Sequence, residues 1–282
     1  MPKYLDPKAD LTFKKIFGQH KHLVMSLLNA LLPMPDGMEI MSVEYLTPEN
    51  IPDNPGKKYS IVDVYCTDNL NRNFIVEMQS VWNTEFFVRT LFNVASVYTK
   101  QLEKGMSFGD LKDVYALCLV NDKKAFEQYG GNEYIQEYYL TNKNHPEDIR
   151  HDLSLIFVEL VKYKPADRGS RAIKDLWLRF LTEINEQTVK VDDVLLENPD
   201  ISQALNIVER SAYTDADLYV YEDYLLEVMT QRNSMKSERE DGFAEGLAEG
   251  IIATAKRMKN EGLGISLIAK ITQLPPNEIE KL

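Results

Sequence analysis

The chain has 282 residues, of which 44% are hydrophobic and 27% are charged, a balance typical of globular proteins with a full core. No apolar run approaches the roughly 20 residues of a membrane-spanning helix, and residues 1–15 lack the apolar centre of a secretory signal. The two cysteines lie in separate apolar runs, which argues against a disulfide framework and against a cysteine-rich metal site. We therefore expect a cytoplasmic protein that does not associate with membranes.

The formal net charge of −12 disfavours a nucleic-acid-binding surface that covers the whole molecule. Residues 183–227 hold 12 Asp or Glu residues against Lys190 and Arg210, so this segment accounts for 10 of the 12 net negative charges. Residues 1–22, by contrast, hold five Lys and two Asp. The acidity is concentrated in one segment, and a basic groove elsewhere remains compatible with the composition.

The N-terminal residues predict a helix followed by a strand. Apolar residues at helical spacing indicate a helix over residues 10–32, interrupted near Gly18. Residues 39–49 are predicted to form a first strand. Residues 50–58 are dense in Pro, Asn and Gly, which predicts a loop.

The next elements are predicted to complete a mixed α/β core. Two strands over residues 59–67 and 73–81 flank the turn-rich sequence "DNLNRN". An amphipathic helix over residues 84–104 follows, and the continuous apolar run at residues 113–121 is typical of a central strand. The order helix, three strands, helix, strand predicts an α/β fold with a mixed sheet.

The remaining sequence divides by composition. Short apolar stretches at residues 138–142 and 153–160 are expected to add strands to a core that spans residues 1–165. Residues 166–235 are predicted to form an acidic helical region, and residues 236–282 a helical tail. We expect the C-terminal region to be mostly helical.

The tail has two notable features. Gly242, Gly246 and Gly250 lie four residues apart, which would allow two helices to approach closely and form a homodimer, or would instead leave a loosely structured segment. Two short helical pieces separated at Leu274–Pro275 resemble a helix–turn–helix, although the last piece carries two Glu residues against a single Lys. Packing or oligomer contact is the alternative role for these pieces.

Two carboxylates are predicted to face each other across the central hairpin. If the strands over 59–67 and 73–81 pair so that partner numbers add to 140, Asp63 lies directly opposite Glu77. Two like charges at this spacing repel, and a divalent cation between them would relieve the repulsion. The alternative is that both acids face water on an exposed side of the sheet.

The pattern of Asp63 followed by "Glu77-Met78-Gln79" resembles the active-site signature of the PD-(D/E)xK nuclease superfamily. Three further stretches, "DPKADLTFKKIFG", "FFVRTLFNVASVYTKQLEKG" and the C-terminal "EGLAEGIIATAKRMKNEGLGISLIAKITQLPPNEIEKL", are similar to the Rpn-like family of recombination-promoting nucleases or putative transposases. The resemblance implies a restriction-endonuclease-like core. It also implies a DNA endonuclease that uses Mg²⁺, with Mn²⁺ or Ca²⁺ as alternatives, and that has a link to DNA recombination or mobile elements.

The same resemblance implies roles for individual residues. Asp63 and Glu77 are expected to bind the metal, and Asp10 matches a family carboxylate, although it could instead cap its helix. Gln79 occupies the position where the superfamily usually has Lys, and it can hydrogen-bond the attacking water but supplies no positive charge. Arg89 could supply that charge, or it could simply pair with Glu85 four residues earlier.

Lys14 is a second candidate for the missing positive charge, or it could simply be a solvated residue of its helix.

Two other functions are compatible with the same fold. One is transposase-like strand transfer at the same site, and the other is a catalytically inactive interaction protein.

Overall fold

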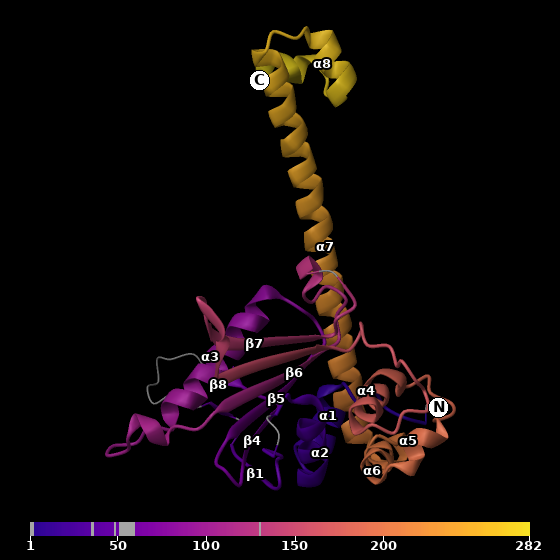
Figure 1. The fold of residues 1–282 in the computed structure, drawn as a ribbon. Coiled ribbons are helices and arrows are strands. Elements are labelled where there is room, and N and C mark those ends of the chain that lie inside the picture. Colours follow the sequence, from indigo (N-terminus) through magenta and orange to yellow (C-terminus); the bar gives the residue numbers. More distant parts are fainter. Residues whose placement is uncertain (1–2, 35–36, 48, 51–59, 130) are drawn as a thin grey trace. The chain divides into compact units, whose positions relative to one another are not determined.

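The computed structural model describes residues 3–34, 37–47, 49–50, 60–129 and 131–282 of the chain. The chain divides into two compact units, one that ends at Leu226 and one that spans Glu227–Leu282. The first unit contains the sheet and the second is helical (Figure 1).

Within the described residues, six strands of the first unit form one mixed sheet in the order β1-β4-β5-β6-β8-β7. The pairs β5–β6 and β6–β8 are parallel, and the other neighbours are antiparallel. The strands are β1 (Val43–Tyr45), β4 (Val64–Asp68), β5 (Asn73–Gln79), β6 (Val114–Val120), β7 (Ile135–Asn142) and β8 (His145–Glu159). A separate two-stranded sheet joins β2 (Glu49–Asn50) to β3 (Ser60–Ile61).

Helices cover both faces of the six-stranded sheet (Figure 1). One face packs against α1 (Asp10–Phe17), α2 (Lys21–Leu31) and α4 (Ile173–Glu183). The other packs against α3 (Thr84–Lys100). Because successive side chains of a strand point to opposite faces, Leu117 enters the first layer while its neighbour Cys118 enters the second. This explains why β6 reads as a continuous apolar run.

The predicted fold class is confirmed, and so is the predicted hairpin register. The β4–β5 pairs include Val64 with Val76 and Thr67 with Asn73, whose numbers add to 140. The second predicted strand is divided in the structure. Ser60–Ile61 form β3 of the smaller sheet, Asp63 lies in a bend, and β4 begins at Val64. Residues 51–58 of the predicted loop, and residue 59 of that strand, lie outside the described residues.

The predicted interruption of the first helix occurs at Gly18. The backbone N–H of Gly18 donates to the carbonyl oxygen of Lys14 at 2.8 Å. A Cβ at position 18 would lie only 2.7 Å from that same oxygen, so a larger residue would force the chain to shift. Glycine at position 18 therefore allows α1 to end and α2 to begin only a few residues later.

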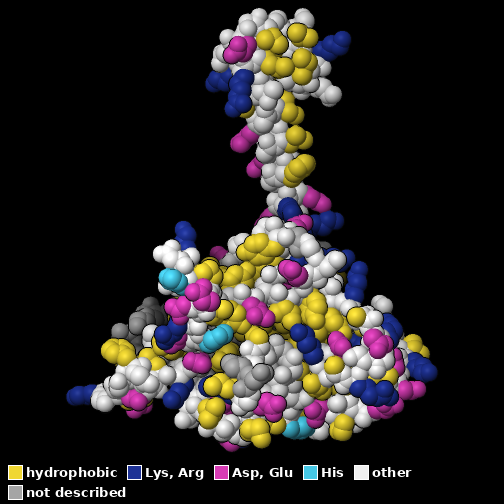
Figure 2. All heavy atoms as spheres, in the orientation of Figure 1, with side chains coloured by type: hydrophobic (Ala, Val, Ile, Leu, Met, Phe, Trp, Pro, Cys, Tyr) yellow, Lys and Arg dark blue, Asp and Glu magenta, His cyan; other side chains and the backbone are white. Residues whose placement is uncertain are grey.

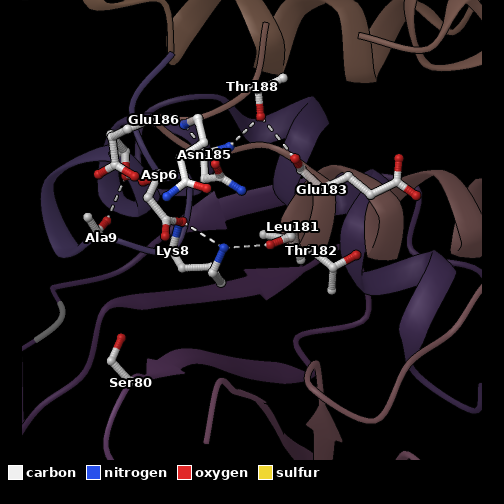
Figure 3. A network of polar contacts seen from close by, with 12 residues as sticks. Asp6, Lys8, Ala9, Ser80, Leu181, Thr182, Glu183, Asn185, Glu186 and Thr188 are labelled. Carbon is white, nitrogen blue, oxygen red and sulfur yellow. Dashed lines mark hydrogen bonds and ion pairs between the residues drawn. The ribbon is translucent and has the colours of Figure 1, made fainter. Parts of the chain in front are cut away.

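A polar network anchors the segment that leads into α1 (Figure 3). The ammonium of Lys8 donates to the carbonyl oxygen of Leu181 at 2.8 Å and pairs with Asp6 at 2.8 Å. The backbone N–H of Asp6 donates at 2.8 Å to the hydroxyl of Tyr221, which donates in turn to Glu186. These contacts tie the residues just before α1 to α4 and to Tyr221.

The C-terminal part of the chain is largely helical, as predicted. Its elements are α5 (Asp193–Glu197), α6 (Pro199–Ile207), α7 (Asp215–Asn260), α8 (Ile265–Thr272) and α9 (Pro276–Lys281). The second unit has a small core of Ala255, Ile268 and Ile279. Among the described residues, no helix is both long and apolar enough to span a membrane.

The glycines of α7 lie on an open part of the helix. A Cβ added at Gly242, Gly246 or Gly250 would meet no atom within 4 Å. Exposed hydrophobic side chains, which include Phe243 and Leu247, follow the same part of α7, and a row of yellow side chains is visible there in Figure 2. Within the described residues, then, the glycines are not explained by close packing inside the chain.

Candidate active site

Asp63 and Glu77 reach the same end of the central hairpin from neighbouring segments. Asp63 immediately precedes β4, and its Oδ2 accepts a hydrogen bond from the backbone N–H of Met78 in β5 at 2.8 Å. Glu77 precedes Met78 in the same strand. The bend before β4 thus turns the Asp63 carboxylate onto the backbone of the strand that carries Glu77.

Glu77 is a buried carboxylate with few compensating partners. The residue is 5% exposed, and its Oε1 accepts a hydrogen bond from Nδ2 of Asn93 at 3.1 Å. Its Oε2 lies 3.8 Å from Nη2 of Arg89. The pKa of Glu77 is raised to about 7. Burial is the largest cause and the negative charge of Asp63 adds to it, while Arg89 and Asn93 oppose the rise.

The electrostatics of Asp63 show which other groups surround it. Burial raises the pKa of Asp63, and the hydrogen bond from Met78 opposes that rise. Lys14 and Arg89 lower this pKa through their positive charges, while Asp10 raises it. Residues of α1 and of the first half of α3 therefore both contribute charge to the hairpin end.

Asp10 is the first residue of α1, and its carboxylate pairs with Nζ of Lys14 at 2.6 Å. The N-cap position belongs to Ala9. Asp10 therefore occupies the first turn, where a carboxylate is favoured by the helix dipole, and it lies within electrostatic reach of Asp63.

Gln79 and Arg89 form one unit at the end of β5. The amide nitrogen of Gln79 donates to the carbonyl oxygen of Val81, and its amide oxygen accepts from Nη2 of Arg89 at 3.2 Å. The guanidinium of Arg89 also lies over the ring of Phe86, 5.0 Å from its centroid. The Arg89 side chain is 49% exposed, so its positive charge is held beside Glu77 but remains open to solvent.

Two neighbours of the site were not found by sequence reasoning. Asn93 lies four residues after Arg89 on α3, and this spacing places both on one helix face, so the periodicity of α3 could have identified it. The hydroxyl of Tyr224, on α7, lies 3.1 Å from Oγ of Ser80, which follows Gln79. No local pattern in the sequence indicates that contact.

The donor set suits a hard divalent cation. Among the described residues, no group of three or more His, Cys, Asp or Glu side chains is arranged to hold a metal ion. Magnesium, however, keeps several water ligands and is commonly bound through one or two carboxylates together with substrate phosphates. Asp63 and Glu77 provide two such carboxylates, and their mutual repulsion is what a cation would relieve.

Comparison with known proteins identifies the family. Residues 7–238 match the family model described as PD-(D/E)XK nuclease family transposase. No curated protein and no solved structure matches the chain. The matched range covers more than half of the chain and includes every candidate residue described above. The chain belongs to the PD-(D/E)XK nuclease family transposases.

Proposed function

We propose that the protein is a metal-dependent DNA endonuclease that hydrolyses phosphodiester bonds in DNA recombination or in mobile elements. Family membership supports a nuclease-type function. The observation that carries the finer proposal is the pair of under-compensated carboxylates, Asp63 and Glu77, beside a half-exposed Arg89. A pair of this kind favours binding of a cation over binding of a neutral ligand.

Asp63 and Glu77 would hold the cation, which we propose to be Mg²⁺, with Mn²⁺ or Ca²⁺ as alternatives. When bound, such an ion polarises a phosphate oxygen, lowers the pKa of water and aligns the reacting groups. The protein prepares the two carboxylates for this role. The Met78 N–H fixes Asp63 at 2.8 Å, and the Asn93 amide fixes Glu77 at 3.1 Å.

Arg89 would supply the positive charge that the superfamily usually takes from Lys. The Gln79 amide oxygen holds Nη2 of Arg89, and the amide nitrogen is occupied by Val81. In this arrangement Gln79 orients Arg89, and Arg89 stabilises negative charge that develops on the phosphate. Asp10 and Lys14, paired at 2.6 Å, adjust the local charge next to Asp63.

A plasmid-nicking assay with Mg²⁺, Mn²⁺ or Ca²⁺ tests this proposal. We expect wild-type protein to nick the plasmid, and Asp63→Asn and Glu77→Gln to lower the rate at least ~100-fold, which corresponds to about 3 kcal/mol of transition-state stabilisation. Glu147→Gln is the matched control, because that carboxylate is 76% exposed on β8. Full activity in an Asp63→Asn, Glu77→Gln double variant would refute the assignment of the site.

Strand transfer is the second candidate, because the matching family is described as a transposase family. The same residues would act, and the acceptor of the phosphoryl group would be a DNA 3′-hydroxyl instead of water. Joined products from a labelled donor and a target plasmid distinguish it from hydrolysis. The predicted homodimer through the C-terminal helices stays a prediction, because an open glycine face on α7 fits a partner helix and a solvated helix equally.

A further inference from the structure

The first turns of α7 bring a tyrosine to the candidate site from a distant part of the chain. The hydroxyl of Tyr224 lies 3.1 Å from Oγ of Ser80, across 144 positions of sequence. Ser80 directly follows Gln79 at the end of β5. Tyr224 belongs to the first compact unit, so this contact lies within one body.

The surroundings of the Tyr224 hydroxyl are those of the site. Burial raises the pKa of Tyr224, and the carboxylates of Asp10, Asp63 and Asp6 raise it further. The phenol therefore stays protonated near neutral pH and can donate a hydrogen bond. It is a neutral donor placed among acidic groups.

Tyr221, one turn earlier on the same helix, has a hydroxyl with a purely structural role. Tyr221 and Tyr224 both pack against the small cluster that includes Leu5 and Ala9. The hydroxyl of Tyr221 is buried and is used on both sides, since it accepts from the backbone N–H of Asp6 and donates to Glu186. Packing of the ring and these two hydrogen bonds together account for the Tyr221 side chain.

Tyr224 differs from Tyr221 in its hydroxyl. The side chain is half-buried, and its hydroxyl meets another side-chain hydroxyl instead of a backbone group or a carboxylate. A tyrosine hydroxyl has one donor and two acceptor positions, and the contact with Ser80 uses one of them. The ring is explained by packing, whereas the position of the hydroxyl is not.

We propose that Tyr224 is a substrate-binding residue whose hydroxyl donates a hydrogen bond to a phosphate oxygen of the nucleic-acid backbone at this site. The inference rests on the proposed function and extends it to α7. A phosphate that approaches Asp10 and Asp63 meets negative charge, so a neutral donor beside these acids lowers the cost of binding it. Together with Arg89, Tyr224 would hold the substrate backbone from two different helices.

The variant Tyr224→Phe tests the proposal, because it keeps the ring in the cluster and removes only the hydroxyl. We would measure kcat and KM for plasmid nicking in Mg²⁺, and the Kd of a labelled duplex oligonucleotide in Ca²⁺. We expect KM and Kd each to rise about tenfold, the size of a hydrogen bond to a charged group, with kcat changed less than about twofold. The melting temperature should stay close to that of the wild type.

Tyr221→Phe is the matched control, since it removes a hydroxyl from the same cluster. That variant should lower the melting temperature and leave Kd unchanged, because its lost partners are Asp6 and Glu186. Unchanged KM and Kd in Tyr224→Phe would overturn the inference, and so would a fall in kcat at constant Kd. If the wild type binds the duplex but does not nick plasmid, the proposed hydrolysis fails, while the Kd comparison still decides the role of Tyr224. A wild type that binds no duplex overturns both.

Discussion

Two clusters of buried charge in the first compact unit are built in opposite ways. In one, the guanidinium of Arg179 on α4 is fully buried and meets Glu183 at 3.0 Å, Asp192 at 2.7 Å and the carbonyl oxygen of Arg168 at 2.7 Å. The hydrogen bond that Arg179 donates lowers the pKa of Asp192, and the positive charge of Arg179 lowers it further. The guanidinium of Arg168 lies 3.7 Å from Glu183, so two carboxylates are balanced by two guanidiniums in this cluster.

In the other cluster the charges are not matched. Burial raises the pKa of both Asp63 and Glu77, and the charge of Asp63 raises that of Glu77 further. The cation beside Glu77 lies 3.8 Å away on a half-exposed side chain. A cluster that only stabilised the fold would not keep two carboxylates in this state, because an unpaired buried charge costs several kcal/mol. The comparison indicates that Arg179 stabilises the fold, whereas the hairpin end holds two carboxylates without matching charge, as the proposed cation site requires.

The largest expected effect on stability comes from breaking the matched cluster. Arg179→Ala removes the nearest cation from Glu183 and Asp192 and opens a cavity, so the free energy of unfolding should fall by about 3 kcal/mol. Urea denaturation measures it. Arg171→Ala is the control, because that guanidinium is 67% exposed in its pair with Glu197 and its loss should cost less than about 1 kcal/mol. Equal losses in the two variants would contradict the comparison.

The next variant, Glu77→Gln, is expected to raise the free energy of unfolding. The folded protein binds the Glu77 proton more tightly than the unfolded chain does, since the pKa rises from its ordinary value of 4.5 to about 7. The stability that Glu77 contributes is present below pH 4.5 and is lost as the pH rises through 7. The side chain of Gln stays neutral at every pH in this range, so Glu77→Gln avoids the cost of a buried charge. We expect the variant to be more stable than the wild type by about 1–3 kcal/mol at pH 8 and nearly equal to it at pH 4.5.

Urea denaturation at both pH values, in EDTA to remove divalent ions, measures this difference. Glu147→Gln controls for removal of a surface charge. If Glu77→Gln is destabilised at pH 8 relative to the wild type, then Glu77 is compensated in the folded protein and the contrast with Arg179 does not hold.

Divalent cations sharpen the comparison further. If Asp63 and Glu77 bind Mg²⁺ with a Kd of about 1 mM, then 10 mM Mg²⁺ should stabilise the wild type by about 1.4 kcal/mol. Asp63→Asn and Glu77→Gln should each lose this stabilisation. Arg179→Ala should show the same gain on addition of Mg²⁺, although its melting temperature without the ion is lower. A thermal shift titration reports this without any DNA. The same shift in wild type and both site variants would show that the ion binds elsewhere.

Much of the fold was predictable because it depends on local periodicity. The apolar run of β6 indicated burial on both faces, and Gly18 indicated where the helix over residues 10–32 is interrupted. The register of β4 and β5 followed from the short turn between them, since few registers bury Val64 and Val76 on one side. These features are encoded within about 20 residues of sequence each.

The site was only partly predictable because its geometry depends on tertiary contacts. The pairing of Asp63 with the Glu77 strand followed from the register, but the bend that turns Asp63 onto the Met78 N–H did not. Whether Arg89 would meet Glu85 or the strand could not be decided from helical spacing, and in the structure its guanidinium contacts Gln79. Tyr224 reaches the site only because α7 docks on the N-terminal segment, a contact between residues far apart in sequence.

The smallest expected effect on stability separates Arg89 from Arg179 most clearly. Arg89 is half-exposed and its ion pair with Glu77 is long, so Arg89→Gln should change the free energy of unfolding by less than about 1 kcal/mol. Its effect on nicking should nevertheless be at least ~10-fold, because a cation that stabilises developing phosphate charge acts in the transition state. Urea denaturation and the nicking rate, measured on the same preparation, give both values.

The double variant Gln79→Lys, Arg89→Gln returns the positive charge to position 79 on β5, and it should recover part of the lost nicking rate. Gln79→Lys alone places two cations side by side and should not exceed the wild type. If Gln79→Lys alone is the more active protein, then Gln79 contacts the reacting water directly and does not serve to orient Arg89.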